Sequence, residues 1–153
     1  MVKDVFDTLL EEVGRSLEIP DLHPDSHHSC LIKLINGVSV QIEMDSQLQF
    51  ITLGSDLGSL PTGKYRENVF REALKTNAQS GGVLHGVLAF SNKTDHLVLF
   101  KQMPMQDLTG EKIADEIAPF SEKALHWKNA LEHGEVPVVS NIHTSAGMFG
   151  LRP

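Results

Sequence analysis

The segment CLIKLINGVSVQIEM, residues 30–44, decides the fold class of this chain. Apolar residues recur at every second position on both sides of Asn36-Gly37: Cys30, Ile32 and Leu34 before it, and Val38, Val40, Ile42 and Met44 after it. A period of two is that of a β-strand with one buried face. Asn-Gly supplies the positive φ that both central residues of a type I′ turn require, so the segment predicts a β-hairpin.

Three other segments have the period of an amphipathic helix, with apolar residues three or four positions apart. They are residues 2–17, residues 62–77, and a last helix that begins after Thr109 as N-cap and ends at Gly134. Their apolar stripes are Val2, Phe6, Leu9, Leu10, Val13 and Leu17; Tyr65, Val69, Phe70, Ala73 and Leu74; and Ile113, Ile117, Phe120, Ala124, Trp127 and Leu131.

Three further strands are predicted at residues 47–53, 83–90 and 96–102. Gly54 and Gly58 should interrupt the chain before the second helix, and Gly81-Gly82 should form a turn. The expected order is therefore α-β-β-β-α-β-β-α, an α+β fold (an α/β sandwich) with three helices on a mostly antiparallel sheet of five to six strands. One face of so small a sheet can stay uncovered. We expect one domain over residues 1–134 and a mobile C-terminal tail over residues 135–153.

The composition is that of a folded domain with an acidic surface. The chain has 153 residues, 41% of them hydrophobic, and a net charge of −7, with acidic residues concentrated in residues 1–25. This charge repels phosphate groups, which argues against nucleic acid and anionic membranes as partners. A single cysteine allows no internal disulfide, and the sequence shows neither a signal-peptide pattern nor a run of about 20 apolar residues. We expect a cytoplasmic protein without membrane insertion.

No residue pattern predicts catalysis. His23, His27 and His28 are interrupted by a proline, so they fit an exposed loop better than a zinc site. Cys30 alternates with the apolar residues of a strand, which predicts a buried thiol and not a nucleophile. Gly81-Gly82 lacks the lysine and serine of a phosphate-binding loop. The sequence thus predicts no catalytic residue, no metal and no cofactor, as in a protein that is not an enzyme.

The predicted sheet has more apolar residues than helices on one face can cover. Leu31 and Ile35 lie on the opposite face of the hairpin from Cys30. In the next strand, Ile51 lies opposite Phe50. A second protomer, a partner peptide, or the loops and tail of the same chain must cover the excess.

Several landmarks occur in order along residues 2–133. They are Cys30-x-Ile32-x-Leu34 before Asn36-Gly37, Val40-x-Ile42-Glu43, Leu57-Gly58-x-Leu60-Pro61, Leu74-x-x-Asn77, Gly81-Gly82 leading into Leu88-x-Phe90, Leu97-x-Leu99, Met103-Pro104-Met105, and Phe120-x6-Trp127-x3-Leu131. With these landmarks the chain resembles the Tir chaperone family, the class I chaperones of bacterial type III secretion. The resemblance implies the secretion-chaperone fold and a homodimer.

The resemblance also implies two binding surfaces. The second predicted helix would form the dimer interface, through Tyr65, Val69, Phe70, Ala73 and Leu74. The N-terminal segment of a secreted effector would bind in extended form, partly by strand addition, against Phe6, Leu9, Leu10, Val13, Leu31, Ile35, Phe50 and Ile51.

The function that the resemblance implies is that of a type III secretion chaperone. Such a protein keeps the N-terminal segments of its effectors extended, soluble and secretion-competent without ATP. Its partners would be secreted effectors and a second copy of itself, with the secretion-apparatus ATPase as a further candidate. The alternative is a dimeric regulator of the secretion system on the same fold. The third interpretation is a small hydrolase that depends on Cys30 or a metal, which Cys30→Ser and His27→Ala would test.

Overall fold

The computed structural model describes residues 4–138 of the chain. Its elements are α1 (Val5–Leu17), β1 (Ser29–Lys33), β2 (Ser39–Met44), β3 (Phe50–Ser59), α2 (Lys64–Ala78), β4 (Val87–Ser91), β5 (His96–Pro104) and α3 (Gly110–Glu132). The predicted order of helices and strands and the α+β fold class are confirmed. The predicted tail falls largely on residues 139–153, which lie outside the described part, and Val136 at its start packs against the core.

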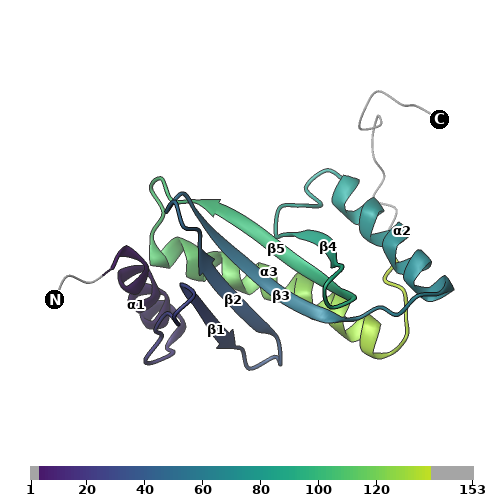
Figure 1. Cartoon of the computed structure of the whole chain (residues 1–153), viewed down its shortest axis with the longest axis horizontal. Helices are drawn as coiled ribbons and strands as arrows, with labels where there is room; N and C mark the ends of the chain where they lie inside the picture. Colours follow the sequence, from purple (N-terminus) through teal and green to yellow (C-terminus); the bar gives the residue numbers. More distant parts are fainter. Residues whose placement is uncertain (1–3, 139–153) are drawn as a thin grey trace.

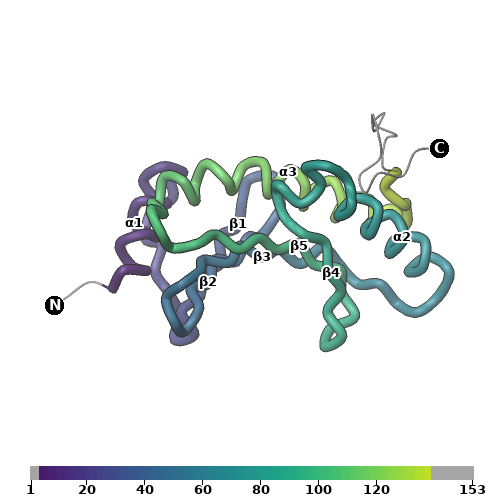
Figure 2. Tube along the Cα trace, turned by 90° about the horizontal axis from the view of Figure 1, so that it is seen from above, coloured from purple at the N-terminus to yellow at the C-terminus, as the bar shows by residue number. Residues whose placement is uncertain are grey.

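The five strands form one antiparallel sheet in the order β1-β2-β3-β5-β4. The helices lie on one side of this sheet, as the view along its edge shows (Figure 2). α1 lies near the β1 and β2 side, α3 runs along the sheet, and α2 lies beside β4 at the other end (Figure 1). The sheet therefore has one covered face, one open face and two edge strands, β1 and β4.

The predicted hairpin is present, but its turn differs from the predicted type I′. Cys30 pairs with Ile42 across β1 and β2, and the Leu34 N–H donates to the Val38 carbonyl at 2.9 Å. Within the loop, the Gly37 N–H donates to the Leu34 carbonyl at 3.0 Å, and Gly37 alone has a positive φ, of 88°. This is the pattern of a three-residue loop, which needs one left-handed residue instead of the two that a type I′ turn needs.

β3 is longer than predicted because its glycines do not interrupt it. It runs through Gly54 and Gly58 to Ser59 and pairs with β5 along its length. The register shifts between Asp56 and Gly58, where Gly58 has φ of 125° and donates its N–H to the Asp56 carboxylate at 2.9 Å. The glycine thus forms a β-bulge, which bends a strand without ending it.

β4 is shorter than predicted. It begins at Val87, and the chain between α2 and β4 consists of turns instead of extending from residue 83. Gly81 has φ of 74°, and a Cβ on Gly82 would lie 1.8 Å from the Thr76 carbonyl oxygen. The pair therefore forms the predicted turn, with a left-handed conformation at Gly81 and a close backbone approach at Gly82.

The hydrophobic core lies between the covered face of the sheet and the helices. α3 packs against both α1 and β3. At the α1–α3 contact, the Gly110 N–H donates to the Glu12 carboxylate at 2.7 Å, and a Cβ on Gly110 would lie 2.2 Å from the Cβ of Glu12. Thr109 caps α3 as predicted, accepting the Lys112 N–H at 3.2 Å. A glycine at the first position of α3 is what lets the two helices approach so closely.

Candidate protein-binding surfaces

The residues predicted to bind an effector divide into a buried and an exposed group. The buried group, with exposed fractions of 0 to 6%, comprises Phe6, Leu9, Leu10, Val13 and Ile51. The exposed group comprises Leu31, Ile35 and Phe50, with exposed fractions of 57%, 108% and 36%. The α1 stripe thus belongs to the core, and these five side chains could meet a partner only by leaving it.

The exposed group lies on and beside the open face of the sheet. The even-numbered residues of β1 and its flanks face β2, because the Leu34 N–H bonds to Val38 and the His28 carbonyl accepts the Met44 N–H. The N–H and C=O groups of Leu31 and Lys33 therefore point away from β2, toward the outer edge. Among residues 4–138 no strand lies beyond that edge. β1 and the loop after it thus offer the exposed side chains of Leu31 and Ile35 beside an open backbone edge.

Three of the five residues predicted for the dimer interface, Phe70, Ala73 and Leu74, line a groove at the opposite end of the sheet. On α2, Val69 and Ala73 are buried, Tyr65 and Phe70 are half-buried, and Leu74 is 69% exposed. The groove between α2 and β4 has a volume of about 160 Å³ and is lined by Phe70, Ala73, Leu74, Asn77, Leu88, Ala89, Phe90 and Leu97. Every lining side chain except that of Asn77 is apolar.

Aromatic contacts fix the walls of this groove. The Phe70 and Phe90 rings meet edge to face, with centroids 5.0 Å apart. The Arg66 guanidinium lies 4.6 Å from the centroid of Phe90 and donates to the Leu60 carbonyl. Leu88 and Phe90 were not predicted as part of this surface. Their alternation in the sequence was the available signal, but it does not say which helix lies beside the strand.

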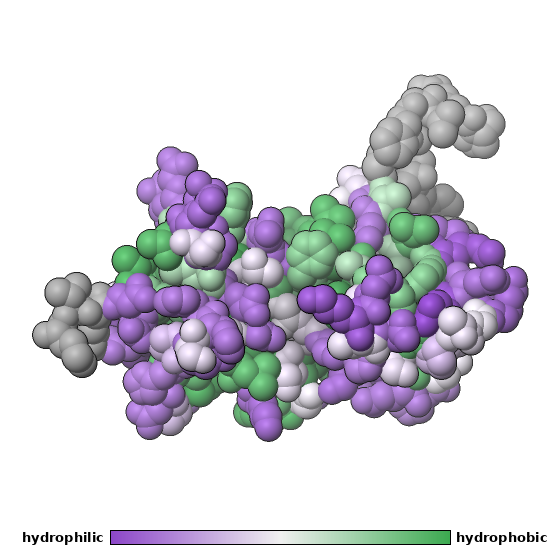
Figure 3. All heavy atoms as spheres, viewed as in Figure 1, coloured by the Kyte–Doolittle hydropathy of each residue, from purple (hydrophilic) through white to green (hydrophobic). Residues whose placement is uncertain are grey.

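The space-filling view shows apolar areas around α2 and β4 and others toward the α1 end of the molecule, with hydrophilic residues between them (Figure 3). The middle of the open face is mixed in character. A hollow there is lined by polar side chains, among them Gln41, Glu43 and Thr52, and by apolar ones, among them Leu31, Val98 and Phe100.

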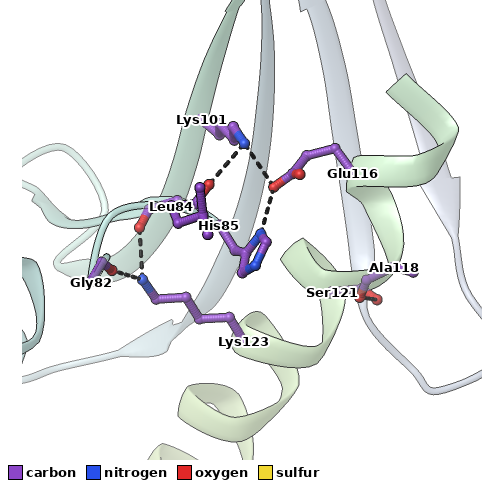
Figure 4. A network of polar contacts seen from close by, with 9 residues as sticks. Gly82, Leu84, His85, Lys101, Glu116, Ala118, Ser121 and Lys123 are labelled. Carbon is purple, nitrogen blue, oxygen red and sulfur yellow. Dashed lines mark hydrogen bonds and ion pairs between the residues drawn. The ribbon is translucent and has the colours of Figure 1, made fainter. Parts of the chain in front are cut away.

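A polar network holds the loop that leads from α2 into β4 (Figure 4). The Lys123 ammonium, from α3, donates to the carbonyls of Gly82 and Gly86. Burial of this side chain lowers the pKa of Lys123. Nearby, the Glu116 carboxylate lies 2.9 Å from the Lys101 ammonium and 3.1 Å from His85 Nδ1. The network fixes the start of β4 against α3.

The sequence matches one known protein family over most of the described chain. The sequence model of the Tir chaperone protein (CesT) family matches residues 8–128, which include all five strands and most of the three helices. The chain belongs to the CesT family. A comparison with curated protein sequences gives no significant match.

Solved structures resemble this CesT-family chain over most of its length. The HopA1–SchA chaperone–effector complex contains a chain with a TM-score of 0.65 and 22% identity, covering 82% of this chain and 94% of the other. The Yersinia pestis type III secretion chaperone SycH, in complex with a fragment of YscM2, gives 0.62 and 17%, with 79% and 98% coverage. The ExoU–SpcU complex of the Pseudomonas aeruginosa type III secretion system gives 0.58 and 16%, with 86% and 98% coverage. At these identities the likeness establishes the fold.

The residues considered for catalysis do not form a reactive site in the CesT-family chain. His23, His27 and His28 are exposed in the loop before β1, as predicted. Cys30 is 6% exposed, and burial raises the pKa of its thiol, which disfavours the nucleophilic thiolate. Within residues 4–138, no three histidine, cysteine or acidic side chains are arranged to hold a metal, and no helix is long and apolar enough to cross a membrane.

Proposed function

We propose that this chain is a cytoplasmic type III secretion chaperone. It binds the N-terminal segment of one or a few secreted effectors and keeps that segment extended and secretion-competent, without ATP and without catalysis. The observation that carries the proposal is the match of the CesT family model to residues 8–128. The similar solved structures, which include a chaperone–effector complex, support it.

The β1 edge supplies a physical means of holding an extended segment. A strand added there would pair with the open backbone groups of Leu31 and Lys33 and contact the exposed side chains of Leu31 and Ile35. Backbone pairing gives affinity that does not depend on the partner's sequence, and the side-chain contacts add selectivity. The free energy gained from these contacts must exceed the free-energy cost of ordering the effector segment. No nucleotide or chemical step is needed for this binding.

The α2–β4 groove supports a homodimer. Leu74 and the two phenylalanines of the groove present apolar surface that water covers in a single protomer. A second copy, seated through the same groove, would cover it in a closed two-fold arrangement. This geometry leaves both β1 edges free for effectors, because β1 and β4 are at opposite ends of the sheet.

The proposal is tested by affinity capture from a native lysate of the source organism, with mass spectrometry and limited proteolysis of the captured proteins. We expect one or a few secreted proteins, each protected over an N-terminal segment. The Leu31→Glu variant should lose them, because a carboxylate replaces an apolar contact at the β1 edge. Leu48→Glu is the matched control, since Leu48 is similarly exposed, at 52%, in the turn before β3.

Two results would contradict the proposal. One is the capture of no secreted protein, and the other is capture that Leu31→Glu does not reduce. Capture of secretion-apparatus or transcription components alone would favour the dimeric regulator. Cys30→Ser and His27→Ala should leave effector capture unchanged, whereas a hydrolase that depended on either residue would lose its activity.

A further inference from the structure

The two edge strands of the sheet differ in how many of their outward backbone groups remain available. In an antiparallel edge strand, alternate residues direct their N–H and C=O groups away from the sheet, where another strand can pair with them. At β4, Ser91 faces β5, and its carbonyl accepts the Asp95 N–H. The residues that alternate with it, Leu88 and Phe90, therefore direct their backbone groups outward. Gly86, just before the strand, continues the same alternation. At β1 the outward residues are Ser29, Leu31 and Lys33.

The side chain of Asn77 occupies both outward groups of Leu88. Its Oδ1 accepts the Leu88 N–H at 3.0 Å, and its Nδ2 donates to the Leu88 carbonyl at 2.9 Å. A primary amide has the same donor and acceptor as a peptide group, so the side chain takes the position that one residue of a neighbouring strand would take. An incoming strand would have to displace Asn77 to pair with Leu88.

The backbone groups of Gly86, the outward residue that precedes Leu88, are also bonded. Its N–H donates to the Val83 carbonyl at 3.1 Å, within the loop. Its carbonyl accepts from the half-buried Lys123 ammonium at 2.8 Å. Of the three outward positions near β4, only Phe90 is left, and one residue cannot support a β-ladder.

The β1 edge is open by comparison. Ser29 is occupied locally, because the Asp25 carboxylate accepts its N–H at 3.1 Å and the Asp25 N–H donates to its carbonyl at 2.7 Å. Leu31 and Lys33 follow in phase, and within residues 4–138 no backbone group is bonded to their outward side. This edge therefore offers two consecutive outward residues where β4 offers one.

We propose that Asn77 and Lys123 close the β4 edge, so that a partner polypeptide can extend the sheet only at β1. The inference rests on the proposed function for the identity of that polypeptide, an extended effector segment. The closed β4 edge also determines how two copies would meet at the α2–β4 groove. They would be held by side-chain packing and would not form a continuous sheet through β4.

The closure is tested on the isolated protein with no effector present, so that its outcome is independent of the proposed function. Amide hydrogen exchange and sedimentation velocity are measured for Asn77→Ala over a range of protein concentrations. At low concentration the Leu88 amide should exchange about tenfold faster, because it has lost its hydrogen bond. The Ala89 amide, which faces β5, should keep its rate. As the concentration rises, the variant should form species larger than the parent protein, and the protection of Leu88 should return.

Asn129→Ala is the matched control. It removes the same side chain from an exposed position of α3 and leaves the Asn77 bonds to Leu88 in place. It should reproduce the parent in both measurements. Unchanged exchange at Leu88 in Asn77→Ala would overturn the proposal, and so would faster exchange without association. If Asn77→Ala does not fold, Asn77→Leu keeps a side chain of nearly the same size while removing both hydrogen bonds to Leu88. It should also associate, and a parent-like mass for this variant would equally overturn the proposal.

Discussion

Asp45 shows how one side chain can hold a turn at the surface of this fold. Its carboxylate accepts the backbone N–H groups of Gln49 and Phe50, each at 2.7 Å, in the turn that enters β3. The hydrogen bond from the Phe50 N–H is the main cause that lowers the pKa of Asp45. The ionised carboxylate is therefore more favourable in the folded chain than in the unfolded one.

This lowered pKa gives a pH-dependent prediction. Because the folded-state pKa lies below the unfolded value, the contribution of Asp45 to stability is present above the unfolded value. It is lost as the pH falls through the folded pKa. Asp45→Asn should lower Tm at pH 7 and reduce the further loss of Tm on acidification, measured by circular dichroism at pH 7 and pH 3. Asp115→Asn, at an exposed position of α3, is the control. Equal acid dependence in parent and Asp45→Asn would contradict the assignment.

At the scale of elements, the turn between α2 and β4 depends on a glycine without a side chain. A Cβ on Gly82 would lie 1.8 Å from a backbone oxygen of α2, and the chain cannot relieve such a contact by moving a flexible side chain. A Cβ added at Gly54, within β3, would meet no heavy atom of another segment within 4 Å, and Gly54 has no positive φ. The two glycines therefore differ in what they do for the fold.

Substitution of these glycines by alanine should separate the two roles. Gly82→Ala should lower the free energy of unfolding by at least about 2 kcal/mol, because the α2–β4 turn must rearrange. Gly54→Ala should change it by less than about 0.5 kcal/mol, because the added methyl group meets open space. Urea unfolding of the two variants and the parent measures both values. Similar losses for the two variants would show that close approach at Gly82 is not the reason for its glycine.

The limits of sequence-based prediction are clearest in the strands and in α1. Alternation located the hairpin, but it could not distinguish a two-residue turn from the three-residue loop that leaves only Gly37 left-handed. The prediction of breaks at Gly54 and Gly58 was wrong, because cross-strand pairing with β5 holds the chain extended through both. The period of α1 showed that one face is apolar, and it could not show that the core would cover Phe6, Leu9, Leu10 and Val13. Surface assignments therefore needed the packed structure.

At the scale of the whole molecule, the predicted homodimer depends on the α2–β4 groove. Leu74 is 69% exposed there, so a charge at this position should leave the protomer folded. Leu74→Glu should reduce the light-scattering mass from twice the 16.9 kDa protomer mass to once that mass, because the carboxylate would be buried against apolar side chains. Leu48→Glu, at the other end of the molecule, should keep the dimer mass. A parent mass of one protomer would contradict the dimer, and a dimeric Leu74→Glu would place the interface elsewhere.

The burial of Cys30 has a practical consequence for the whole molecule. It is the single cysteine of the chain, and its side chain is 6% exposed within the core. Maleimide and thiol-specific nitroxide reagents require an accessible thiolate, so they should not label the buried Cys30 of the folded parent protein. A cysteine introduced at Ile35 or at Leu74 would then be the one reactive site, and would carry a spectroscopic label at a single known position. The same protein can thus report separately on its sheet edge and on its groove, with no native residue to remove first.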